Sequence, residues 1–94
     1  MTNPAEHVPE VGRPSVLSVG QCAIDGPRLS RLLGQMGASV TSASTAEEAI
    51  AALRARPFAL VLVNREFAHD GYSGVEFIHR ARVEATDARI MLVS

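Results

Sequence analysis

The residues of this chain that could take part in chemistry lie directly after short apolar runs. Gly20 and Gln21 follow SVLSV, Asn64 follows FALVLV, and Ser94 follows IMLV. The amides of Gln21 and Asn64 donate and accept hydrogen bonds, but they carry no charge and are poor nucleophiles. Ser94 offers a hydroxyl that can hydrogen-bond or, with a base beside it, attack an electrophile. If the fold gathers the ends of these runs, the residues predict a polar, uncharged site.

The other reactive side chains lack the neighbours that catalysis or metal binding requires. Cys22 is the single cysteine, and no base or cation accompanies it in the sequence, which favours an inert thiol over a redox sensor. His7, His69 and His79 lack the spacing of zinc ligands. A small enzyme that uses Cys22 or Ser94 is disfavoured, because no base, oxyanion donors or phosphate-binding glycine loop accompany either residue.

Composition excludes further classes of protein. The 94 residues are 47% hydrophobic and 20% charged, which fits one globular domain with a packed core. Nine Lys and Arg against ten Asp and Glu give a net charge of −1, so no cationic surface for nucleic acid or anionic lipid is expected. No stretch approaches the roughly 18 apolar residues of a membrane span. A lone thiol suits a reducing compartment, so we expect a cytoplasmic protein.

Strands and helices alternate along the rest of the chain. The prolines of residues 1–14 predict a flexible N-terminal lead-in, and the domain is expected to span residues 15–94. Strands are predicted at residues 15–20, 38–42, 58–63 and 90–93, and the unbroken apolar run FALVLV is typical of a parallel strand that is covered on both faces.

A helix is predicted in each interval between strands. Asp25 is expected to cap the first helix, and capping boxes at Ser44 or Thr45 and at Ser73 are expected to open the second and third. The positions predicted to be buried are, helix by helix, Leu29, Leu32, Leu33 and Met36; Ala46, Ala49, Ile50 and Leu53; and Val75, Phe77, Ile78 and Ala81. The order βαβαβαβ predicts an α/β fold with a doubly wound parallel sheet, whose carboxyl edge gathers Gly20, Gln21, Asn64 and Ser94.

In this order and spacing, residues 15–94 resemble most of a receiver domain, the phosphoacceptor module of two-component response regulators. The resemblance rests on the end of the first strand, the run LSRLLGQMGASVTSASTAEEAIAALRARPFALVLVN, the helix start GVEFI and the strand end MLVS. It implies a flavodoxin-like fold with strand order 2-1-3-4-5. The fifth strand and the last helices of the family have no counterpart in this chain.

The resemblance also implies that the phosphoacceptor pocket is degenerate. The two magnesium-binding acids of the family correspond to Gly20 and Gln21, its phosphoacceptor Asp to Asn64, and its phosphoryl-binding Thr or Ser to Ser94. The loop after Asn64 departs too, since Ala68 stands where the family usually has Pro. Because an aspartyl phosphate needs a carboxylate and Mg²⁺ prefers anionic oxygens, phosphotransfer and Mg²⁺ binding are expected to be lost. Restoring them is expected to need Asp at all three changed positions together.

Three acids in loops near the pocket could replace the lost metal ligands. These are Asp25, Glu66 and Asp70. We expect a plainer role, with Asp25 at a helix start and the other two solvated.

The sequence is therefore interpreted as a pseudo-receiver, without enzyme activity, cofactor or small-molecule substrate, that binds signalling proteins. The alternative is a structural fragment of a larger response regulator. Without a fifth strand beside it, the last strand exposes an edge made of Ile90, Met91, Leu92 and Val93. We expect this edge, or the apolar face next to it, to mediate self-association or to be completed by another segment.

Overall fold

The computed structural model describes residues 13–93, so Ser94 and residues 1–12 of the predicted lead-in lie outside the described residues. Within this range, strands β1 (Ser15–Val19), β2 (Ser39–Ala43), β3 (Leu60–Asn64) and β4 (Arg89–Val93) form one sheet. All pairs are parallel, and the order is β2-β1-β3-β4. Helices α1 (Asp25–Gln35), α2 (Ala46–Ala55) and α3 (Gly74–Glu84) connect the strands. The predicted α/β fold and its strand order are confirmed.

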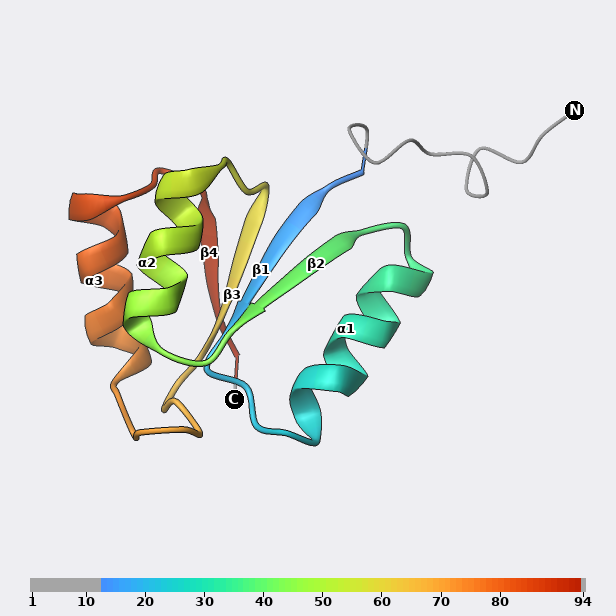
Figure 1. Cartoon of the computed structure of the whole chain (residues 1–94), viewed down its shortest axis with the longest axis horizontal. Coiled ribbons are helices and arrows are strands. Elements are labelled where there is room, and N and C mark those ends of the chain that lie inside the picture. The colour runs from blue at the N-terminus through green and yellow to red at the C-terminus, as the bar shows by residue number, and fades with distance from the viewer. Residues whose placement is uncertain (1–12, 94) are drawn as a thin grey trace, which may run out of the picture.

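Helices α2 and α3 pack on one face of the sheet, and α1 lies on the other (Figure 1). The main core fills the space between the sheet and the α2–α3 layer. Its fully buried members include Leu17 and Val19 of β1, Val61 and Val63 of β3, and Phe77 of α3. The predicted inner face of α2 is confirmed, because Ala46, Ala49, Ile50 and Leu53 are all buried.

Two of the three predicted helix starts are confirmed. Thr45 Oγ1 accepts the Glu48 N–H at 3.1 Å, and Glu48 Oε1 accepts the Thr45 N–H at 3.1 Å, so the capping box of α2 uses Thr45 rather than Ser44. Ser73 Oγ accepts the Glu76 N–H at 3.3 Å at the start of α3. The predicted cap at Asp25 is wrong, since Asp25 already lies in the first turn of α1.

The predicted buried stripe of α1 is also wrong. No residue of this helix is buried, and Leu32 and Met36 are 56% and 74% exposed. The physical reason is that α1 is the only helix on its face within residues 13–93 and lies mainly along β2, next to the edge of the sheet. Val75 of α3, predicted to be buried, is likewise half-exposed, while Phe77 and Ala81 are buried as expected.

A polar network at the surface fixes α3 against α2 and against the loop before α3. The Arg80 guanidinium donates to Tyr72 Oη at 3.3 Å, Glu84 at 3.2 Å and Glu47 at 3.4 Å. These bonds, that of Tyr72 foremost, raise the pKa of Arg80 above its ordinary value. Arg80 thus keeps its charge and steadies the Tyr72 ring, which packs on Phe67 beside the site.

Candidate functional site

Asn64 ends β3 and joins two loops through its side-chain amide. Its Nδ2 donates to the carbonyl oxygen of Gly20 at 3.1 Å and to that of Glu66 at 2.8 Å. The Gly20 oxygen also accepts the backbone N–H of Ala68 at 3.0 Å. The ends of β1 and β3 and the loop after β3 are therefore held together by neutral hydrogen bonds, and the predicted proximity of Gly20 and Asn64 is realised.

Gly20 leaves no room for a side chain. Its φ is +77°, a left-handed conformation that glycine adopts without strain, and a Cβ placed there would lie 2.5 Å from Cδ1 of Phe67. Phe67 is 1% exposed and packs on the rings of Tyr72 and Phe77 at centroid distances of 5.6 and 5.7 Å. An aromatic ring thus fills the space beside the end of β1.

Gln21 takes no part in this hydrogen-bond network. Its Nε2 is buried without a hydrogen-bond partner, and it lines a pocket on the α1 side of the sheet. The structure therefore brings Gly20 and Asn64 into direct contact and leaves Gln21 beside them with an unsatisfied donor. Ser94, the fourth predicted member of the site, lies outside the described residues.

The residues present do not fit a magnesium ion. The Asn64 amide presents its N–H groups inward, and the two carbonyl oxygens they reach are already bonded. Among residues 13–93, no group of three His, Cys, Asp or Glu side chains could hold a metal. Asp25 lies in the first turn of α1, and Asp70 Oδ1 accepts the Tyr72 N–H at 3.1 Å.

Cys22 has a structural role at the start of α1. Its Sγ accepts the Asp25 N–H at 3.2 Å, and its carbonyl oxygen accepts the Gly26 N–H at 2.8 Å. Among the described residues, no His or carboxylate hydrogen-bonds to this thiol. The sulfur thus satisfies the Asp25 N–H, one of the donors in the first turn of α1.

Sequence reasoning missed Phe67 and Ala68 as parts of the site. Phe67 is the one large apolar residue in an otherwise polar loop, and that contrast is the signal that could have identified it. The Ala68 contribution comes from its backbone N–H, which no sequence pattern marks.

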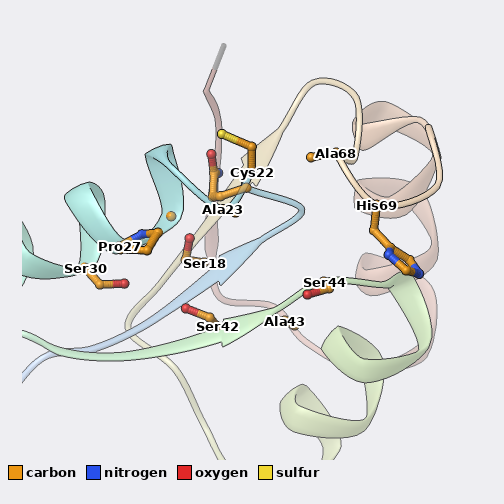
Figure 2. Close-up of a pocket in the computed structure, with 12 residues that line it drawn as sticks. Ser18, Cys22, Ala23, Pro27, Ser30, Ser42, Ala43, Ser44, Ala68 and His69 are labelled. Carbon is orange, nitrogen blue, oxygen red and sulfur yellow. The ribbon is translucent and has the colours of Figure 1, made fainter.

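A pocket of about 670 Å³ opens beside this network, between α1 and the ends of β1 and β2 (Figure 2). Ser18 and Ser42, on neighbouring strands, and Ser30 on α1 line it, together with Gln21. His69 lies at the end of the pocket away from α1.

Solved structures with the same arrangement of elements include response regulators and a structure described as an adenylate cyclase from Rhodopirellula baltica, which superposes with a TM-score of 0.75 at 23% identity, over 87% of this chain and 59% of that one. A response regulator receiver domain (CheY-like) from Methylobacillus flagellatus superposes with a TM-score of 0.78 at 17% identity, over 87% of this chain and 70% of that one. The fold is that of a receiver domain. No family model and no curated protein matches the receiver-like chain.

Two further matches are to a longer response regulator chain and to a complex of a histidine kinase with a response regulator. One is a response regulator protein from Burkholderia pseudomallei with a phosphorylated aspartic acid, calcium ion and citrate, at 25% identity and a TM-score of 0.73. The match covers 84% of this chain but only 45% of that one. The other is the histidine kinase ThkA in complex with the response regulator protein TrrA, at 25% identity, a TM-score of 0.72 and coverages of 84% and 66%.

Proposed function

We propose that this chain is a receiver-like signalling module that is not switched by phosphorylation at the tip of β3. The observation that carries the proposal is the Asn64 amide, which donates to the carbonyl oxygens of Gly20 and Glu66. A phosphoacceptor must present a free carboxylate oxygen to the phosphoryl donor. The amide here is neutral, and both of its N–H groups are used to close the loops over the end of the sheet.

The proposed mode of action is protein binding, without catalysis or a cofactor, in a cytoplasmic two-component or phosphorelay pathway. The match to a complex of a histidine kinase with a response regulator supports a signalling protein as the partner. The net charge of −1 argues against nucleic acid or a membrane surface. No helix in residues 13–93 is long and apolar enough to cross a membrane.

Exposure to phosphoryl donors provides the test. We expect acetyl phosphate with Mg²⁺ to leave the intact mass unchanged, because Asn64 is no nucleophile. Beryllofluoride with Mg²⁺ should likewise leave the amide NMR signals of Gly20, Gln21 and Asn64 in place, since no carboxylate holds the ion. A phosphorylatable receiver domain treated in parallel serves as the positive control. An acid-labile mass increase, or magnesium-dependent shifts around Gly20, would contradict the proposal.

A second candidate is a structural fragment of a larger response regulator. It is favoured by the match to the Burkholderia protein, of whose chain the superposition covers 45%. In that case the receiver-like domain would act as one part of a longer protein, and its output would depend on the remaining parts.

We further propose that the partner, or a second copy of the chain, docks on the edge of β4. Within the described residues, β4 pairs with β3 alone, so its other edge has unpaired backbone groups. Ile90 and Leu92 pack against the core, whereas Met91 is 50% exposed on the opposite face. We expect sedimentation to show association that rises with concentration, and Met91→Lys to weaken it.

The matched control for Met91→Lys is Val83→Lys, because Val83 is 87% exposed and belongs to α3 rather than to β4. A monodisperse monomer at hundreds of micromolar, with fast hydrogen exchange at those amides of residues 90–93 that do not bond to β3, would speak against the edge as a docking site.

A further inference from the structure

The pocket between α1 and the sheet contains a buried hydroxyl group that forms no hydrogen bond. Ser18 is 1% exposed, and its Oγ is buried with no hydrogen-bond partner. Among residues 13–93, Ser18 is the only polar residue that is buried. Its neighbours in β1 are apolar. A buried hydroxyl without a partner destabilises a fold, so a natural sequence tends to keep one where it serves another purpose.

Further polar groups converge on the same space. The register of β1 and β2 places Ser18 directly beside Ser42, and Ser30 faces both from α1 (Figure 2). The Gln21 amide adds a second buried donor, Nε2, that has no partner. With Ser44, four hydroxyls and one amide therefore line a cavity of about 670 Å³, which is within the usual size range of small-molecule sites.

The lining also limits the charge and shape of a ligand. No Lys, Arg, Asp or Glu lines this pocket, and its one imidazole, that of His69, lies at the end away from α1. An ionic ligand held between the sheet and α1 would therefore lose its hydration without gaining a counter-charge beside it. The apolar part of the wall consists of small residues such as Ala23, Pro27 and Ala43, and no Phe, Tyr or Trp ring is present on which a nucleobase could stack. Hydroxyl groups on a compact ligand match this lining best.

We propose that this pocket binds a small uncharged ligand rich in hydroxyl groups, such as a polyol or a monosaccharide. Ser18 and Ser42 would hydrogen-bond adjacent hydroxyls of the ligand from the sheet, and Ser30 would do so from α1. The Gln21 Nε2 would donate to a further ligand oxygen. Binding would satisfy both buried polar groups that lack a partner in the unliganded chain.

The pocket is well placed to affect the receiver-like domain. Gln21 follows Gly20, whose carbonyl oxygen is held by Asn64 and Ala68, and Ala68 also lines the pocket. A ligand would therefore contact the two loops that the Asn64 network joins. The site does not depend on whether Asn64 can be phosphorylated.

The test titrates the full chain with myo-inositol and, separately, with inorganic phosphate, while amide NMR shifts are recorded. We expect myo-inositol to give saturable shifts at Ser18, Gly26 and Ser42, with a dissociation constant below about 10 mM. Inorganic phosphate should leave these amides unmoved. Shifts that grow linearly without saturation would overturn the proposal, and tighter binding of phosphate would overturn the uncharged ligand class.

Ser18→Ala separates a binding role from a structural one. If the hydroxyl is kept for a ligand, the variant should melt at a higher temperature than the parent and bind myo-inositol at least about tenfold more weakly. Ser30→Ala, in a helix that favours Ala, should weaken binding without loss of fold. The control is Ser15→Ala at the start of β1, outside the pocket, which should leave binding unchanged. A Ser18→Ala variant that is less stable, or that binds as the parent does, contradicts the proposal.

Discussion

Replacing Gly20 with Asp, the first step toward an acidic pocket, is expected to destabilise the domain by about 2–6 kcal/mol. A side chain at φ +77° is strained by about 1–3 kcal/mol. Its Cβ would also meet Cδ1 of the buried Phe67 at 2.5 Å, and overpacking of this kind costs about 1–3 kcal/mol. The carboxylate would in addition lie at a buried position. Against a total stability of roughly 5–14 kcal/mol for a domain of this size, the loss is severe. Urea unfolding of the variant and the parent measures it.

Gly34→Ala is the matched glycine control. Gly34 lies in α1, and a Cβ there meets nothing within 4 Å, so the substitution should stabilise the domain by about 0.5–1 kcal/mol. Gly20→Ala and Phe67→Leu, alone and combined, give a double-mutant cycle. If the ring is the obstacle, the double variant should be more stable than the sum of the single effects predicts. A Gly20→Asp variant within about 1 kcal/mol of the parent would refute the account.

Sequence patterns predicted the frame of this molecule because they depend on local rules. The apolar run before Asn64 is a buried central strand, and the Thr45–Glu48 and Ser73–Glu76 spacings mark real helix starts. The prediction that α1 buries its apolar face was wrong because burial is not a local property. The apolar period of α1 correctly indicated a helix, but whether Leu32 and Met36 are buried depends on which elements cover that face, and a local pattern does not carry that information.

The site was predictable in position but not in geometry. The ends of parallel strands meet at one edge, so the proximity of Gly20 and Asn64 followed from topology. The direction of the Asn64 amide did not, because it depends on the carbonyl oxygens of Gly20 and Glu66. The position of Phe67 was not predictable from a local pattern either. Because a Cβ at Gly20 would lie 2.5 Å from Cδ1 of this ring, an acid at that position requires the ring to move.

Asn64→Asp is expected to destabilise the domain by about 2–4 kcal/mol at neutral pH. The parent amide donates to two carbonyl oxygens at 3.1 and 2.8 Å, whereas an ionised carboxylate would place an acceptor against the same acceptors. Because these oxygens disfavour the charged form, the pKa of the introduced carboxyl should be raised in the folded state. The folded variant then binds more protons than the unfolded chain, so its stability relative to the parent should improve as the pH falls through that raised pKa.

Asn64→Ala isolates the charge from the lost hydrogen bonds. It removes both donors without adding a carboxylate, and Ala68 still donates to Gly20, so a smaller loss of about 1–2 kcal/mol is expected. Urea unfolding between pH 5 and pH 8 should show a pH-dependent gap between Asn64→Asp and the parent and a nearly constant gap for Asn64→Ala. A carboxyl pKa at or below the ordinary value of about 3.9, measured by NMR, would mean that the two carbonyls do not face the residue. If the gap appears as expected, the neutral amide is what holds the two loops closed, and a carboxylate there would open them before any phosphoryl group arrived.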